Sequence, residues 1–228
     1  MKTTAAILAL GLFAWTREAG AETRRTARCE GGSYTYLLEA PPGNRPKPAI
    51  LLLHGTGGNG GSVLGPWRDF GLANGIVLIA PNLPRDAAFE PKAPAVFRCV
   101  VEDARAAVRL DPKRIYVFGH SMGGYLAYDA AMFESEYFAA AAVHAAGIAP
   151  DFDGILAHAI RKIPIAIWIG DADAFVPLAS VRRTRDLLLD AGFPVVFSEL
   201  KGHGHDYEGL APRINREVWS FFEAHRLP

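Results

Sequence analysis

The sequence has no excess of either charge. Its 24 Lys and Arg residues balance 24 Asp and Glu residues, so the formal net charge at pH 7 is +0. A chain without a basic surplus gives no reason to expect nucleic acid or an anionic membrane as its partner. We therefore predict no nucleic-acid partner.

Long hydrophobic runs are absent after the first 21 residues. Lys2, the apolar run at residues 4–15 and the small residues at 19–21 together are typical of a secretory signal peptide, cleaved just before Glu22. An uncleaved membrane anchor is the alternative, but the run is short for a bilayer span. No Cys lies near the cleavage site to carry a lipid. We expect a secreted or periplasmic protein without a membrane span.

Cysteine is scarce, with Cys29 and Cys99 the only two in the sequence. In an oxidising compartment an even number of cysteines favours a disulfide. Two buried free thiols are the alternative, because the sequence cannot place the two Cα atoms within bonding distance.

The mature chain, residues 22–228, is long enough for one domain with a sizeable core and too short for two comfortable ones. Apolar patterning predicts strands at residues 34–39, 49–54, 76–80, 115–118, 138–144, 163–169 and 195–200. It predicts helices at residues 62–74, with Ser62 as the cap, 96–110, 125–132, 179–191 and 214–225. Pro, Asn and Asp make residues 81–94 an irregular connection. Strands that alternate with helices indicate an α/β fold with a mostly parallel sheet.

The most informative stretch begins with the strand at residues 115–118. It runs into Gly119-His-Ser121-Met-Gly123, and a helix is predicted directly afterwards. Strand, tight turn and helix are the context in which Gly-x-Ser-x-Gly forms a nucleophile elbow. The turn would hold Ser121 in strained backbone angles and project its hydroxyl above the sheet edge. Ser121 is therefore the candidate nucleophile.

A nucleophilic serine needs a base, and the base needs a carboxylate that orients it. Asp171 and Asp173 follow the strand at 163–169, while His203 and His205 follow the last predicted strand. Loops at the carboxyl ends of parallel strands gather at one edge of the sheet, and the order Ser, Asp, His is the one used by hydrolases with this elbow. Position alone does not choose between the two acids or the two histidines.

Four motifs occur in order along the chain: Leu-His-Gly-Thr-Gly-Gly-Asn, Gly-His-Ser-Met-Gly-Gly, Gly-x-x-Asp-x-x-Val-Pro and Gly-x-Gly-His. Together they resemble the α/β-hydrolase superfamily, over nearly the whole mature chain from about Tyr34. The sequence is most similar to the secreted feruloyl esterase and polyhydroxybutyrate depolymerase-type branch, including dienelactone-hydrolase-like relatives. The resemblance implies that Asp173 is the orienting acid and His205 the base. Asp171 then stabilises a turn and His203 is a loop residue.

An oxyanion hole is also expected, because attack on an ester carbonyl creates a negative oxygen that backbone N–H groups can stabilise. The motif assigns one donor to Met122, the residue after the nucleophile. The resemblance assigns the second to Thr56. His54, two residues earlier, is interpreted as a packed structural residue.

Two other interpretations use the same residues. The stretch from Gly55 to Gly60 matches the dinucleotide fingerprint Gly-x-Gly-x-x-Gly, but the next strand ends in Pro81-Asn82 where a ribose-binding acid would be needed. His203, His205 and Asp206 suggest a metal, yet no further ligand stands at a recognisable spacing. We predict neither a cofactor nor a metal.

Only 18 residues, 145–162, separate the strands at 138–144 and 163–169, which leaves no room for a helical cap domain. An open cleft suits a bulky or polymeric ester. The aromatic residues that are candidates to line it, or else to pack in the core, are Trp67, Tyr125, Trp168, Phe175 and Tyr207.

The sequence therefore predicts an exported, single-domain α/β-hydrolase that cleaves carboxylic esters through an acyl-enzyme. Feruloyl, acetyl and hydroxyalkanoate esters are the expected substrates. A peptidase or thioesterase of the same fold is the alternative within this chemistry, and a non-catalytic binding protein is the alternative outside it. The preferred acyl and alcohol groups and the oligomeric state stay open.

Overall fold

The structure, a computed structural model, describes residues 22–84 and 93–228. The predicted signal peptide, residues 1–21, lies outside the described residues, as does most of the predicted irregular connection before Pro94.

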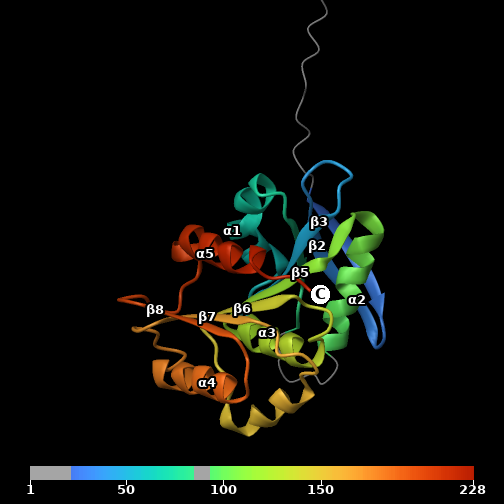
Figure 1. Ribbon diagram of the computed structural model, residues 1–228. Coiled ribbons are helices and arrows are strands. Elements are labelled where there is room, and N and C mark those ends of the chain that lie inside the picture. Colours follow the sequence, from blue (N-terminus) through green and yellow to red (C-terminus); the bar gives the residue numbers. More distant parts are fainter. Residues whose placement is uncertain (1–21, 85–92) are drawn as a thin grey trace, which may run out of the picture.

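One mixed sheet forms the centre of the described part of the chain (Figure 1). Its eight strands are β1 (Thr23–Cys29), β2 (Gly32–Glu39), β3 (Lys47–Leu53), β4 (Val77–Pro81), β5 (Leu110–His120), β6 (Ala140–His144), β7 (Ile165–Gly170) and β8 (Val195–Leu200). They lie in the order β1-β2-β4-β3-β5-β6-β7-β8. β2 is antiparallel to both of its neighbours, and all strands from β4 onward in this order are parallel. The prediction of an α/β fold with a mostly parallel sheet is confirmed.

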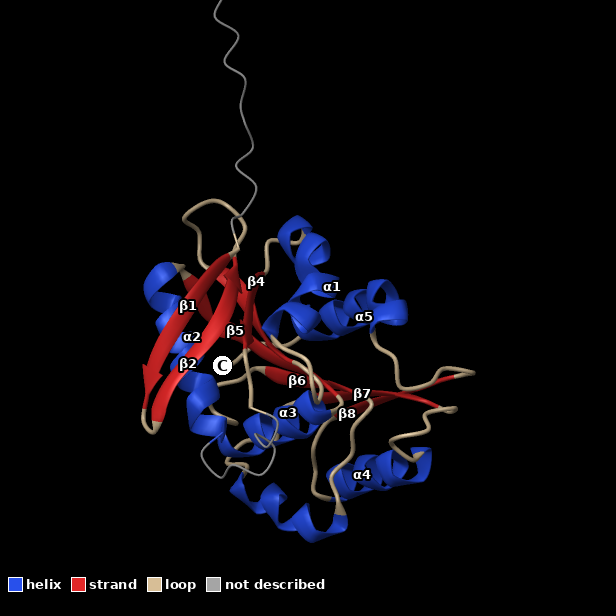
Figure 2. Ribbon diagram, turned by 180° about the vertical axis from the view of Figure 1, so that it is seen from behind, coloured by secondary structure: helices blue, strands red, loops and turns tan. Residues whose placement is uncertain are grey.

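Helices cover both faces of this sheet. They are α1 (Gly60–Ala73), α2 (Ala93–Ala107), α3 (Met122–Phe133), α4 (Leu178–Asp190) and α5 (Ala211–Glu223), with short 3₁₀ segments η2 (Pro150–His158) and η3 (Glu208–Leu210). α1 and α5 lie on one face, and α2, α3 and α4 lie on the other (Figures 1 and 2). Within residues 22–84 and 93–228 no helix combines the length and the apolar character needed to cross a bilayer.

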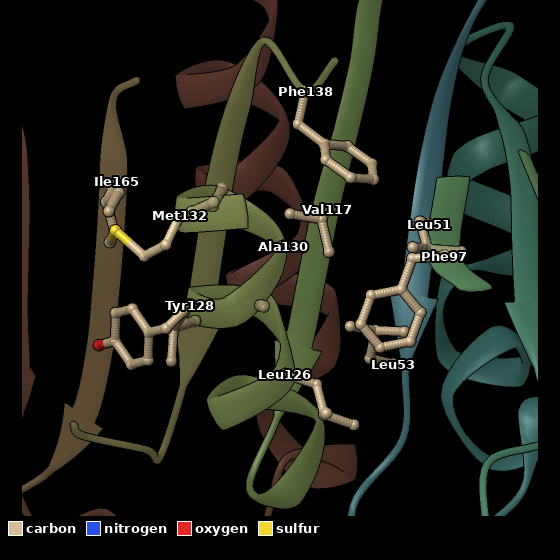
Figure 3. Packing of buried hydrophobic residues seen from close by; sticks show 14 of the residues in the cluster. Leu51, Leu53, Phe97, Val117, Leu126, Tyr128, Ala130, Met132, Phe138 and Ile165 are labelled. Atoms are coloured by element: carbon tan, nitrogen blue, oxygen red, sulfur yellow. The ribbon is translucent and has the colours of Figure 1, made fainter. Parts of the chain in front are cut away.

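The alternation of side chains along β3 explains why two cores form. Ile50 and Leu52 point into the cluster under α1 and α5, whereas Leu51 and Leu53 point into the cluster under α2, α3 and α4. Figure 3 shows the second cluster, with Phe97 of α2 beside Leu53. A strand buried on both faces needs apolar residues at every position, which is why the sequence reads as a continuous run.

The connection between β6 and β7 contains only the nine-residue η2. This stretch is fully described and holds no cap domain. The C-terminal edge of the central strands is therefore covered from this side only by η2.

Three local predictions were wrong. β1 was not predicted, because its Arg-rich sequence has no apolar alternation and buries only Ala27. Asn59, and not Ser62, caps α1; Ser62 returns a hydrogen bond to the Asn59 backbone from the third helical position. The helix predicted to reach residue 110 ends at Ala107, and Leu110 already begins β5, which has no partner residues on β3 between Leu110 and Ile115.

Cys29 at the end of β1 and Cys99 in α2 form a disulfide across 70 residues of sequence. The bond ties the edge hairpin to a helix that packs on the sheet.

Opening this disulfide should lower the free energy of unfolding by about 4 kcal/mol, since the bridge restricts a loop of this length in the unfolded chain. Urea unfolding of the Cys29→Ser/Cys99→Ser variant beside the oxidised protein measures the difference. Two free thiols found by alkylation and mass spectrometry of the non-reduced protein would contradict the bridge.

Candidate active site

The backbone at Ser121 is strained between β5 and α3. Its φ of 54° and ψ of −120° lie where residues other than glycine are rare. The N–H of Ser121 donates to the carbonyl oxygen of His144 at 2.9 Å, which fixes the turn against β6. The predicted elbow conformation is therefore present.

Glycine is required on both sides of Ser121 because the backbone passes too closely for a side chain. A Cβ at Gly119 would lie 1.9 Å from the carbonyl oxygen of Gly123. A Cβ at Gly123 would lie 2.0 Å from the carbonyl oxygen of Leu53. The two glycines of the motif let α3 start directly above β3 and β5.

His205 joins Ser121 to Asp173. The His205 Nε2 atom lies 2.9 Å from Ser121 Oγ, and its Nδ1 atom lies 2.8 Å from Asp173 Oδ2. The carboxylate accepts a hydrogen bond from Nδ1–H, which keeps the proton on Nδ1, so Nε2 is free to accept the Ser121 hydroxyl proton. Such a chain of hydrogen bonds can activate a serine for attack on a carbonyl carbon.

Asp173 is built to stay ionised although its side chain is fully buried, with 0% exposed. Burial alone would raise its pKa, but hydrogen bonds from the Val176 N–H, His205 and the Phe175 N–H outweigh it and hold the pKa below its usual value. Its second oxygen, Oδ1, accepts from Phe175 N at 2.8 Å and Val176 N at 2.9 Å. The local turn that we expected of Asp171 is thus made by Asp173.

Asp171 instead joins the two loops that carry Asp173 and His205. Its Oδ1 accepts from Gly202 N at 2.6 Å. The same loops approach so closely at Gly170 that a Cβ there would lie 2.0 Å from the carbonyl oxygen of His203. This contact sets the register in which the acid and the base meet.

The loop after β3 carries Thr56 and is shaped by His54. His54 Nε2 accepts from Leu83 N at 3.0 Å, so Nδ1 carries the proton and donates to the Gly55 carbonyl oxygen at 2.8 Å. Burial lowers the pKa of His54, which keeps this tautomer neutral. The backbone N–H of Met122 lies at the N-terminus of α3, where intrahelical partners are lacking. The oxyanion roles of Thr56 and Met122 stay predictions.

Comparison with known proteins connects this geometry to a family. A family model described as the alpha/beta hydrolase family matches residues 50–219, from β3 to α5. The chain belongs to the alpha/beta hydrolase family.

Relatives of this chain include “Putative esterase NocK” from Nocardia uniformis subsp. tsuyamanensis, which is 31% identical over 175 residues. That alignment covers 68% of this chain but only 49% of NocK, so the chain spans about half of that relative. A solved thermostable esterase superposes with a TM-score of 0.72 at 22% identity, covering 90% of this chain and 63% of that one. The S-formylglutathione hydrolase FrmB of Staphylococcus aureus gives 0.72 at 17% identity, covering 87% and 94%. At these identities the two structures support the fold alone.

Two histidines near Ser121 and His205, namely His120 and His144, were missed by the sequence analysis. They are register partners at the carboxyl ends of β5 and β6, and their Nδ1 atoms lie 2.9 Å apart. Burial is the main cause that lowers the pKa of His120 to about 4, and the nearby His205 contributes less. Burial also lowers the pKa of His144. The His120 ring lies 5.1 Å from the His205 ring, centroid to centroid. The sequence does hold a signal for them, because each of two consecutive strands ends in a histidine.

The predicted lining residues divide between site and core. Phe175 is 80% exposed and its ring lies 5.1 Å from the His205 ring, while Tyr125 is 37% exposed on the first turn of α3. Tyr207 is largely buried, with its ring against His120 and its hydroxyl on Asn215. The prediction was wrong for Trp67, which is fully buried against Phe118, and for Trp168, which donates to Glu217 from within the sheet. Aromatic residues next to strands and in amphipathic helices are more often core.

Two cavities lie near the elbow, one lined by residues of α3 that follow Ser121 and one by residues that include His120. One, of about 310 Å³, lies between α3 and η2 and includes Tyr125. The other, of about 210 Å³, includes Thr56, His120 and the residues that follow His205.

Proposed function

We propose that this protein is a serine carboxylic ester hydrolase in which Ser121, His205 and Asp173 act as a catalytic triad. The observation that carries the proposal is the His205 ring, which lies within hydrogen-bond distance of both Ser121 Oγ and Asp173 Oδ2. The esterase name of the relative NocK supports this chemistry.

In the first half of the reaction, Ser121 Oγ bonds to the ester carbonyl carbon while its proton passes to His205 Nε2. The Met122 and Thr56 N–H groups stabilise the negative oxygen. The bond to the alcohol then breaks, the alcohol oxygen takes the proton from Nε2, and an acyl-enzyme remains. Asp173 holds Nδ1–H and stabilises the imidazolium.

Water completes the cycle by the same route. Its proton passes to His205 Nε2 as its oxygen bonds to the acyl carbon. The bond to Ser121 Oγ breaks, Oγ regains the proton, and the carboxylic acid leaves. No redox step occurs, and His205 returns each proton that it accepts.

The substrates that we propose are feruloyl, acetyl or hydroxyalkanoate esters, including polymeric ones. The short β6–β7 connection supports this, because η2 leaves the site without a cap domain that would exclude a bulky chain. We also propose that the protein is exported, and the Cys29–Cys99 disulfide supports an oxidising compartment.

The test is labelling by a fluorophosphonate probe, combined with hydrolysis of methyl ferulate, short-chain nitrophenyl esters and a hydroxyalkanoate polymer. We expect covalent labelling at Ser121 and faster turnover of esters than of matched anilides and thioesters. Faster anilide or thioester cleavage would identify a peptidase or thioesterase instead. A folded protein that is not labelled and cleaves none of these substrates would be a binding protein.

A further inference from the structure

An unpaired carboxyl group lines the larger of these two cavities, between α3 and η2. Asp129 lies on α3, one helical turn after Tyr125, and both residues line the cavity of about 310 Å³. Within the described residues Asp129 has no hydrogen bond and no ion pair, and burial raises its pKa to about 6. A partly desolvated carboxyl without a partner is costly, so it needs either a proton or a cation.

Nearby acidic groups do not share this situation. Asp153 of η2 pairs with Arg183 of α4, and Glu134, just after α3, pairs with Arg98 of α2. His158 of η2 stacks on Phe133, with ring centroids 4.3 Å apart. No neighbouring charge shifts the pKa of Asp129. The described residues therefore supply no countercharge to Asp129.

The remaining walls of the cavity suit an organic cation. Phe152, Ile148 and Ile155 supply apolar surface, and the aromatic residues Tyr125 and Tyr128 also line it. Aromatic faces together with one carboxylate are the groups that bind alkylammonium ions.

Contacts from α4 and from the end of α3 hold the η2 wall of the cavity in place. Thr184 Oγ1 of α4 accepts from Ile148 N at 2.8 Å, and Arg183 holds η2 through Asp153. The stack of Phe133 on His158 closes the far end of η2 onto α3. Because these contacts fix η2 through α3 and α4, a cation that enters the cavity meets a wall that is already ordered.

We propose that this cavity is the acyl subsite and accepts acyl chains that end in an ammonium group, with Asp129 as the countercharge. This inference rests on the proposed esterase function.

The leaving alcohol must lie within reach of His205, which returns a proton to it. The smaller cavity is lined by Asp206, Tyr207 and Glu208, the residues directly after His205. The alcohol therefore extends into the smaller cavity, and the acyl chain extends toward Asp129.

The length of the acyl chain follows from the helix. Asp129 lies eight residues after Ser121, or roughly 12 Å along the helix axis. Its side chain leans back toward the helix N-terminus, which shortens the gap to the ester carbon. About five methylene groups between carbonyl and ammonium span what remains, at roughly 1.2 Å per bond.

The experiment compares two 4-nitrophenyl esters of equal shape, the 6-(trimethylammonio)hexanoate and the neutral 7,7-dimethyloctanoate. Above pH 7 we expect kcat/KM to favour the cation by about tenfold or more. Asp129→Asn should bring the ratio close to one, whereas Asp151→Asn, an exposed acid on η2, should leave it unchanged. Both esters share the same triad, so the ratio cancels any titration of the reaction itself.

The pH dependence supplies a second readout. The folded pKa of Asp129 is raised to about 6, so its negative charge is present above that pH and lost as the pH falls through it. The preference for the cation should disappear below this pH in the wild type and be absent throughout in Asp129→Asn.

Hydrolysis of both esters at equal rates would overturn the subsite and leave the esterase function standing. A preference for a cation on the alcohol side only would also overturn it. If neither ester is cleaved and the fluorophosphonate probe does not label Ser121, the esterase function fails. Calorimetry with hexyltrimethylammonium then tests the subsite by itself. Binding to the wild type that is lost in Asp129→Asn supports the subsite, and any other result overturns it.

Discussion

Replacing Ser121 by Ala should lower kcat for a nitrophenyl ester by roughly 10⁴-fold or more and abolish labelling by a fluorophosphonate. The variant loses the atom that forms the acyl-enzyme, while His205 and the backbone N–H donors stay in place. A small residual rate should remain, because the donors still stabilise an oxyanion formed by attack of water.

The matched control is Ser220→Ala, which changes an exposed serine on α5. It should retain the full rate. Circular dichroism of both variants establishes that each is folded. Ester turnover by Ser121→Ala at the wild-type rate would refute the proposed mechanism.

Asp173→Asn should lower kcat by about a thousandfold or more with little change in the free energy of unfolding. An amide in this place can donate to Nδ1, which would leave His205 with its proton on Nε2 and unable to accept one from Ser121. The Oδ1 bonds from Phe175 N and Val176 N can persist, so the turn should survive.

Asp171→Asn is the control for this experiment, because it removes the same charge from the same loop. Asp171 bonds to Gly202 N and not to His205. Its replacement should therefore change stability by about 1 kcal/mol or less and leave kcat within a few-fold of wild type. A larger catalytic loss in Asp171→Asn than in Asp173→Asn would reverse the assignment of the acid.

The sequence was most informative where a local constraint is strict. Strands β3 and β7 are buried on both faces and read as continuous apolar runs. The elbow was found because Gly119 and Gly123 have no room for a Cβ. β1 escaped prediction because an edge strand can be held by backbone pairing to β2 and by a disulfide, without an apolar face.

The site was less predictable where its residues depend on contacts between elements. His120 and His144 become neighbours only through the register of β5 and β6. Asp129 is an ordinary polar position on α3 until η2 folds over it. Trp67 looked like a lining residue, but whether an aromatic side chain faces the core or the cleft depends on the rotation of α1.

The disulfide should affect the stability of the folded protein but not the catalytic rate of each folded molecule. Ser121, Asp173 and His205 all follow Cys99 in the chain, and β2, β4 and β3 lie between the bridged strand β1 and the strand β5 that carries the elbow. At about 4.8 Å per strand, the elbow lies roughly 19 Å from the bridged edge. A reducing environment should therefore decrease the number of folded molecules, while each molecule that remains folded works at an unchanged rate.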